Sequence, residues 1–220
     1  MKPYRTVLFD LDGTLLDTVD MIVASVRHAL AEHLQYDPGR ALAVAGIGMP
    51  LVEQLGGHAT RAGARLDDVL MGRLVQSYLT HNHAVHDEAV RAYPGVEDAL
   101  EQLRRRGARL GIVTSKARGI ADRGLRLCRL RDYFEVLVGS EDVERHKPDP
   151  APVFEGLRRM GLPVQGTVFV GDSPYDVRAG RAAGVSTGAA LWGPFPRADL
   201  DAERPTYAFS RVAEVLAHVI

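Results

Sequence analysis

Thr6-Val7-Leu8-Phe9-Asp10-Leu11-Asp12-Gly13-Thr14, near the start of the 220-residue chain, is the stretch that decides the fold. Its first four residues are apolar or β-branched and too few for a helix, so they predict a buried strand. Side chains of an extended chain alternate between faces, so Asp10 and Asp12 can point to the same side where the strand ends. Gly13 then allows a sharp turn.

Further apolar runs recur along the chain, with helical patterns between them. The candidate strands are residues 110–113, 136–138, 167–170 and 185–190, and the candidate helices are residues 95–106, 150–160 and 211–220. Strands that alternate with helices predict an α/β fold, in which right-handed crossovers connect the strands of a parallel sheet. We expect a Rossmann-like core of three layers, with helices on both faces of a parallel sheet.

The segment from residue 17 to residue 92 interrupts this alternation. It contains amphipathic patterns at 19–34 and 67–83 and shorter helical pieces at 41–45 and 50–55, without a convincing strand. We therefore expect a small all-helical cap at residues 17–92, inserted after the first strand. Residues 1–16 and 93–220 would form the core. An insertion at a functional strand end can act as a lid.

Polar groups with useful chemistry follow three of the later strands. These groups are Thr114-Ser115, Lys147, and the pair Asp172 and Asp176. Ligands of parallel sheets bind at the carboxyl ends of the strands, so these side chains are expected near the first strand end. Carboxylates there can hold a hard cation, and a fixed ammonium can stabilise a transferring phosphoryl group.

Each of these residues also has a purely structural interpretation. Asp-Gly after a strand is common in turns, and Asp176 could serve only the first turn of a helix. Thr114 and Ser115 alone are typical of helix caps, and Lys147 alone is typical of a solvated surface. The Asp-x-Asp-Gly-Thr pattern is harder to dismiss, because it arises by chance in roughly one chain of this length in a thousand.

Together these motifs resemble those of the haloacid dehalogenase-like phosphatases. The resemblance spans residues 6–192, and the helical insertion stands where that family has a small helical cap. The matching motifs are residues 7–18, Thr114, Lys147-Pro148-Asp149-Pro150 and Gly171-Asp172-Ser173-x-x-Asp176.

The resemblance implies a role for each matching residue. Asp10 forms an aspartyl-phosphate, and Asp12 protonates the leaving group and then activates water. Thr114 binds the phosphoryl group, with Ser115 beside it, and Lys147 offsets the charge of Asp10 and the phosphate.

The resemblance also implies Mg²⁺ as the cofactor. Its ligands would be Asp10, Asp172 and the backbone carbonyl of Asp12. Asp176 would orient the site or bind the metal through water.

Other protein classes share parts of this pattern. A calcium-binding EF-hand loop is excluded because its twelfth position, counted from Asp10, is Met21 rather than Glu. Phospho-accepting signalling modules resemble this set, but they place the acidic pair early and have nothing at the position of Asp12. Haloacid dehalogenases also lack that second aspartate. The presence of Asp12 therefore favours a hydrolase of phosphate esters.

The substrate is predicted by weaker similarities. The segment around Gly46 and Gly48, the Thr114-Ser115-Lys116 run and residues 188–193 resemble the phosphoglycolate phosphatase and pyrophosphatase branch. We therefore predict 2-phosphoglycolate as substrate. The alternatives are pyrophosphate, a sugar phosphate, or the reaction of a β-phosphoglucomutase-like phosphomutase. Lys116 suits a second negative charge, although a lone lysine is typically solvated.

Two further signals are weaker. His81, His83 and His86 could bind a transition metal, but a solvated surface is the preferred interpretation. Gly46 and Gly48 form only G-x-G and do not follow a strand, so they do not predict a dinucleotide site. This loop could face the substrate or could be a simple turn between helices.

Composition predicts the broad class and location of the protein. The net charge of -1 gives no reason to expect nucleic acid or a membrane surface as partner. Cys128 is the only cysteine, which fits a reducing cytoplasm. Residues 1–5 do not resemble a signal peptide, and no apolar run is long enough for a membrane helix. We expect a cytoplasmic monomer or homodimer that acts on a small phosphorylated metabolite.

Overall fold

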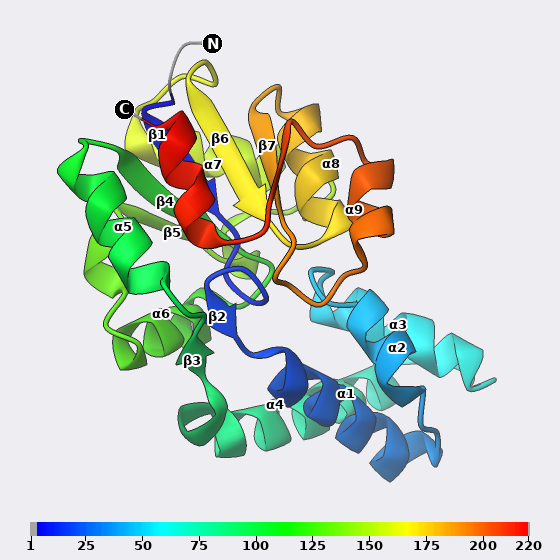
Figure 1. Cartoon of the computed structure of the whole chain (residues 1–220). Coiled ribbons are helices and arrows are strands. Elements are labelled where there is room, and N and C mark those ends of the chain that lie inside the picture. The colour runs from blue at the N-terminus through cyan, green and yellow to red at the C-terminus, as the bar shows by residue number, and fades with distance from the viewer. Residues whose placement is uncertain (1–3, 220) are drawn as a thin grey trace.

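A six-stranded parallel sheet forms the centre of the computed structural model, which describes residues 4–219 (Figure 1). The strand order is β5-β4-β1-β6-β7-β8. The strands are β1 (Thr6–Phe9), β4 (Arg109–Val113), β5 (Val136–Val138), β6 (Thr167–Gly171), β7 (Ser186–Ala190) and β8 (Tyr207–Phe209). The predicted strands are confirmed. The short edge strand β8 was not predicted from the sequence.

Strand β1 lies at the centre of the sheet because its side chains are apolar on both faces. Phe9 is in register with Ile112 of β4 on one side and with Val170 of β6 on the other. Val7 and Phe9 pack into one buried cluster, whereas Leu8 packs into another on the opposite face. This position places the end of β1 where the strand order changes direction, which is where open α/β sheets bind ligands.

Helices cover both faces of the sheet, as a three-layer core requires. Buried residues of α5 (Val96–Arg105) and α6 (Arg118–Leu127) share a cluster with Phe9. Those of α7 (Ala151–Met160) and α8 (Pro174–Ala182) share a cluster with Leu8. The remaining short elements are α9 (Arg197–Ala202), η1 (Arg131–Tyr133), η2 (Ser140–Asp142) and η3 (Val212–His218).

The end of the chain differs from the sequence-based prediction. A helix was expected over residues 211–220, but the described segment η3 is a 3₁₀-helix, and residue 220 lies outside the described residues. Its Val215 and Leu216 are buried against the core, so tertiary packing rather than helix propensity fixes its form. Residues 1–3, part of the segment judged unlike a signal peptide, also lie outside the described range.

Four helices form the cap below the sheet (Figure 1). They are α1 (Val19–Leu34), α2 (Gly39–Ala45), α3 (Leu51–Arg61) and α4 (Asp68–Ala89). Their apolar faces enclose a separate cluster that includes Val26, Leu30, Leu55 and Leu74. Helix α4 begins after Asp67, whose side chain accepts a hydrogen bond from the Leu70 N–H at 2.8 Å. It runs six residues beyond the predicted end at residue 83.

A two-stranded antiparallel ribbon connects the cap to the core. It consists of β2 (Leu16–Asp17) and β3 (Arg91–Ala92), with Leu16 in register with Ala92. The prediction that the inserted segment contains no strand was wrong here, because strands of two residues carry no periodicity. We propose that this ribbon is the junction of the two parts. The predicted boundaries fall within β2 and directly after β3.

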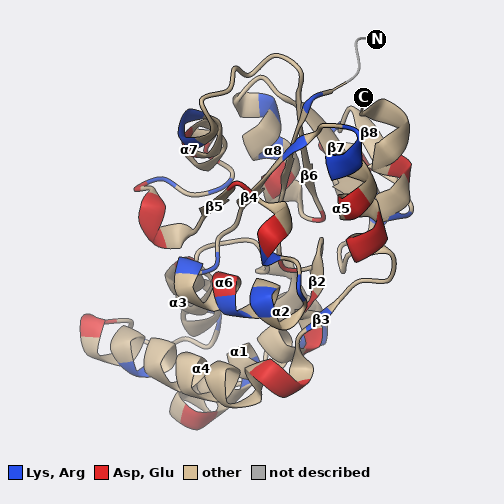
Figure 2. Ribbon diagram, turned by 90° about the vertical axis from the view of Figure 1, so that its left-hand side faces the viewer, with Lys and Arg blue, Asp and Glu red and all other residues tan. Residues whose placement is uncertain are grey.

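Basic and acidic residues are interspersed over both the core and the cap (Figure 2). Among residues 4–219, no helix combines the length and the apolar character needed to cross a membrane.

Candidate active site

Asp10 follows β1 directly and is buried beside Lys147. The Lys147 ammonium donates to Asp10 Oδ1 at 2.8 Å and to Asp176 Oδ1 at 2.5 Å. Only 2% of the Lys147 surface is exposed, so the interpretation of this lysine as a solvated surface charge is wrong. The structure therefore brings together one buried cation and two buried carboxylates that lie far apart in the sequence.

Asp172, at the end of β6, completes a cluster of three carboxylates. Oxygens of Asp10, Asp172 and Asp176 lie within 4.8 Å of one another. The Thr14 hydroxyl donates to Asp172 Oδ1 at 2.5 Å, but Asp172 Oδ2 is buried without a hydrogen-bond partner. A buried, unpaired carboxylate oxygen is costly, and a hard divalent cation would satisfy it. The donor set therefore fits a metal ion.

Two glycines leave room for the Asp172 side chain. Gly13 has φ +87°, and a Cβ there would lie 2.4 Å from Asp172 Oδ2. A Cβ on Gly193 would lie 2.3 Å from Asp172 Cβ. Both separations are shorter than real contacts, so any larger residue at either position would displace the carboxylate.

The electrostatics of the cluster also favour a bound cation. Burial raises the pKa of Asp10 to about 7, although Lys147 acts in the opposite direction. Burial, together with repulsion from Asp10 and Asp176, raises the pKa of Asp172 well above its ordinary value. Burial disfavours the Lys147 ammonium, but attraction to Asp10 and Asp176 outweighs it and raises the pKa. One lysine therefore does not neutralise the three carboxylates.

Asp176 holds both Lys147 and the start of α8. Its Oδ2 accepts from the Ser173 N–H at 3.0 Å, and its own N–H donates to Ser173 Oγ at 3.3 Å. This reciprocal pair is a capping box. Asp176 therefore lies in the first turn of α8, as its structural interpretation predicted, and its Oδ1 also accepts from Lys147.

Asp12 lines the pocket and contacts Lys116. Its Oδ1 accepts from the Thr18 hydroxyl and from the Lys116 ammonium, each at 2.6 Å. The Lys116 side chain is only 10% exposed, so the expectation of a solvated lysine was wrong. The pairing was not visible in the sequence, because the two residues are 104 positions apart.

Thr114 and Ser115 stand at the end of β4. Thr114 Oγ1 accepts from the Lys116 N–H at 3.2 Å, and α6 has Ala117 as its N-cap, so Thr114 is not the helix cap. The Ser115 hydroxyl donates to the Gly48 carbonyl of the cap at 2.7 Å. The loop around Gly48 therefore faces the site, as one of its two interpretations predicted.

Two other long-range hydrogen bonds surround the site. The Tyr175 hydroxyl donates to the Ala45 carbonyl of the cap at 3.3 Å. The Trp192 indole N–H donates to the Thr14 carbonyl at 2.9 Å. Thr14 and Thr18 had no role assigned from the sequence. Both lie in the motif of residues 7–18, where hydroxyls beside two aspartates could have indicated carboxylate partners.

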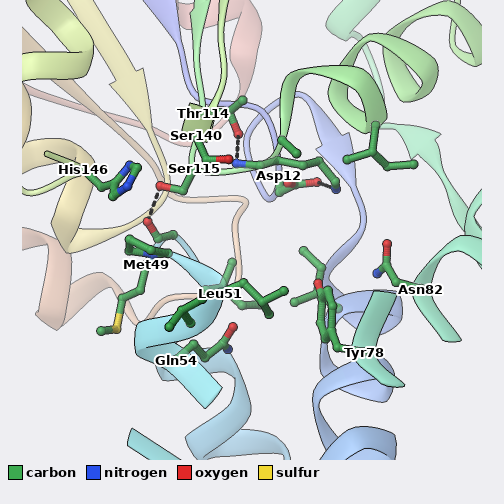
Figure 3. Close-up of a pocket in the computed structure, with 18 of the residues that line it drawn as sticks. Asp12, Met49, Leu51, Gln54, Tyr78, Asn82, Thr114, Ser115, Ser140 and His146 are labelled. Carbon is green, nitrogen blue, oxygen red and sulfur yellow. Dashed lines mark hydrogen bonds and ion pairs between the residues drawn. The ribbon is translucent and has the colours of Figure 1, made fainter. Parts of the chain in front are cut away.

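A pocket of about 430 Å³ lies between the core and the cap. Asp12, Thr114 and Ser115 line its core side, and Met49 and Tyr78 line its cap side (Figure 3). Asp10 also lines it, so a substrate in the pocket would reach the carboxylate cluster.

The histidine segment of α4 is only partly the solvated surface that was expected, because His83 is exposed and His81 is half-buried. His86 is buried, and its Nδ1 lies 2.9 Å from Asp87 Oδ1. His81 stacks on His28, with ring centroids 4.6 Å apart, and His83 lines the pocket. Among the described residues, the candidate metal cluster contains no histidine. The register of α4 turns successive histidines toward different neighbours.

Comparison with known proteins gives consistent results. The model of the haloacid dehalogenase-like hydrolase family matches residues 7–190. Pyrophosphatase PpaX of Halalkalibacterium halodurans is 38% identical over 183 residues, covering 83% of this chain and 81% of that protein. Pyrophosphatase PpaX of Bacillus pumilus is 36% identical over 215 residues, covering 98% and 96%.

Solved structures share the whole fold. A candidate phosphoglycolate phosphatase from Lactobacillus plantarum has a TM-score of 0.85 and 28% identity, with 99% of each chain covered. A haloacid dehalogenase-like hydrolase from Streptococcus pneumoniae has a TM-score of 0.82 and 25% identity, with 97% of each chain covered. These matches confirm the resemblance found in the sequence motifs. The chain belongs to the haloacid dehalogenase-like hydrolase family and is a phosphoric ester hydrolase.

Proposed function

We propose that the protein hydrolyses a small phosphate ester through a phosphorylated Asp10. The observation that carries this proposal is the buried Lys147 between Asp10 and Asp176, next to the unpaired oxygen of Asp172. This arrangement fixes the Asp10 carboxyl group at the end of the pocket, beside a cation that favours its ionised, nucleophilic form.

The proposed reaction has two displacement steps. A carboxylate oxygen of Asp10 attacks phosphorus, and the bond between phosphorus and the ester oxygen breaks. Asp12 gives a proton to the departing oxygen and then accepts one from water, which attacks the phosphoryl group on Asp10. Inorganic phosphate leaves, and the carboxylate of Asp10 is restored. Lys147 and Thr114 hold the charge and the oxygens of the phosphoryl group during both steps.

Asp10 and Asp172 would hold Mg²⁺, with the Asp12 backbone carbonyl as a further ligand. Oxygen donors of this kind suit a hard cation. Asp176 would act indirectly, because one of its oxygens binds Lys147. When bound, Mg²⁺ would offset the repulsion between a carboxylate nucleophile and an anionic phosphate.

Metal binding is expected to raise thermal stability and to depend on Asp172. With Mg²⁺ at about 100 times its Kd, the melting temperature should rise by about 5–10 °C. The variant Asp172→Asn should lose this rise and lose turnover, because it lacks the charge that holds the cation. Differential scanning calorimetry at pH 8, with and without EDTA, measures the shift.

The matched control is Asp68→Asn, which makes the same change at an exposed position of α4. It should keep the full Mg²⁺ shift. An undiminished shift in Asp172→Asn would show that the cation binds elsewhere.

We propose 2-phosphoglycolate as the substrate of choice. Lys116 lies at the core end of the pocket beside Asp12, where it could pair with the carboxylate of the leaving group. Pyrophosphate is the second candidate, supported by relatives that carry the name pyrophosphatase. A panel with these two substrates, sugar phosphates and nucleotides, together with an assay for phosphoryl transfer between sugar hydroxyls, separates the candidates.

Lys116→Met is expected to reduce the preference for substrates with a second negative charge. The ratio of kcat/KM for 2-phosphoglycolate to that for para-nitrophenyl phosphate should fall about tenfold or more, because a charged hydrogen bond is lost. Both substrates depend on Asp12, so the ratio cancels any effect that the loss of Lys116 has on Asp12. Arg118→Met, an exposed neighbour, should leave it unchanged. An unchanged ratio in Lys116→Met would exclude this role.

A further inference from the structure

The pocket beyond Asp12 is walled mainly by apolar side chains. Helix α1, the loop after α2, and helices α3, α4 and α6 all contribute. The apolar residues that line it include Ile22, Ile47, Met49, Leu51, Leu79 and Ile120. Figure 3 shows Met49 and Leu51 on the cap side of the pocket, facing the core residues Asp12 and Ser115. The wall therefore continues directly from the catalytic carboxylates.

Positive charge is scarce in the same space. Lys116 is the one lysine among the described lining residues, and no arginine lines the pocket within residues 4–219. Lys116 is itself held against Asp12 at 2.6 Å, at the core end. The other polar side chains that line the pocket include Gln54, Asn82, His83, Glu141 and His146, and none of them carries a permanent positive charge. A second phosphate group there would meet no permanent cation, and desolvating such an anion without one is unfavourable.

The size of the pocket also suits a ligand with a sizeable apolar body. Its volume of about 430 Å³ falls within the roughly 300–1,000 Å³ typical of sites for organic ligands with substantial apolar surface. A leaving group of two carbons would leave most of the apolar wall in contact with water. An apolar body would instead cover this wall and gain free energy from its burial.

We propose that the cap pocket binds a leaving group with an extended apolar body, so that phosphate monoesters of larger apolar alcohols are substrates. This inference rests on the proposed function, because it requires that Asp10 attacks the phosphorus of an ester bound in this pocket. It extends the substrate class beyond 2-phosphoglycolate. An anionic group near the phosphate could still pair with Lys116, with the apolar body lying farther into the cap.

A series of primary alkyl phosphates tests the inference, because the bond that breaks is chemically the same throughout. We expect kcat/KM to rise from ethyl to butyl to hexyl phosphate, by roughly fourfold for each added methylene. Para-nitrophenyl phosphate and 2-phosphoglycolate, assayed with Mg²⁺ in the wild type and in Asp10→Asn, test the proposed function separately.

Variants of the wall locate the effect in this pocket. Leu51→Asn should flatten the dependence on chain length, whereas Leu42→Asn should retain it. Leu42 is 42% exposed on the cap and does not line the pocket. Met49→Gln, which preserves side-chain length, should also flatten the dependence and serves if Leu51→Asn fails to fold.

The outcomes separate the two proposals. Rising kcat/KM with chain length that is lost in the wall variants supports the inference. A flat or falling dependence, with Asp10-dependent turnover of 2-phosphoglycolate or para-nitrophenyl phosphate, overturns the inference and leaves the proposed function intact. Retention of the rise in Leu51→Asn and Met49→Gln also overturns it. Turnover of none of the esters overturns the proposed function, and the inference with it.

Discussion

Asp10→Asn is expected to lower kcat for para-nitrophenyl phosphate and 2-phosphoglycolate by at least about 10⁴-fold, because removal of a nucleophile abolishes the covalent route. The amide is nearly the same size as the carboxylate, but it cannot form a stable acyl phosphate. Lys147 keeps the Asp176 carboxylate as a charged partner in this variant, so the fold should survive. Phosphate release in the presence of Mg²⁺ measures the effect.

The same experiment distinguishes the phosphatase from the two remote alternatives. A phospho-accepting signalling module would be labelled stoichiometrically at Asp10 without turnover, and a haloacid dehalogenase would release halide rather than phosphate. Asp68→Asn provides the control for the substitution itself. Wild-type-like turnover in Asp10→Asn would mean that another group attacks the phosphorus.

Lys147→Met is expected to reduce both activity and stability. Methionine fills a similar volume but leaves Asp10 and Asp176 buried without their cation. Removing one partner of a buried ion pair costs about 3–5 kcal/mol, which corresponds to a fall of roughly 10 °C in melting temperature for a chain of this size. Thermal unfolding of the metal-free protein at pH 8 measures the loss.

The stability loss of Lys147→Met should shrink as the pH falls. The pKa of Asp10 is raised to about 7 even with Lys147 present, against an ordinary value of 3.8. Protonation of the buried Asp10 carboxyl group therefore stabilises the folded protein fully below about pH 4, and this stabilisation is lost as the pH rises through about 7. Without the lysine the carboxyl is neutral at pH 5, so the gap to the wild type should be smaller there than at pH 8.

Arg145→Met is the matched control for this variant. Arg145 lies two positions earlier, has a side chain that is 76% exposed, and pairs with Asp149 at the surface. Its removal should change stability by no more than about 1 kcal/mol at either pH. An equally small effect of Lys147→Met would contradict the central electrostatic role of the buried ammonium.

The sheet and the gathering of the motifs were predictable because they depend on local patterns and one topological rule. Apolar runs such as residues 6–9 and 167–170 admit only buried strands, and parallel strands present their ends at one edge. Once Asp10, Lys147 and Asp172 were placed at strand ends, their proximity followed.

Features that depend on contacts between distant segments were not predictable. In the β2–β3 ribbon, two residues that precede the cap helices pair with two residues that follow them. Strands this short show no alternation of apolar and polar residues in the sequence. The pairing of Asp12 with Lys116 joins two core loops that follow the neighbouring strands β1 and β4, and the burial of His86 accompanies the packing of α4 on α6. Neither a lysine nor a histidine reveals its partner through its local sequence.

The cap–core hydrogen bonds of Ser115 and Tyr175 both end on main-chain carbonyls of the cap, those of Gly48 and Ala45. Every amino acid supplies a carbonyl, so substitutions of side chains in the cap leave these two acceptors in place. The cap can therefore acquire new residues along its pocket wall during evolution while its attachment to the catalytic core persists. Substrate preference in this enzyme should accordingly diverge faster than catalytic competence.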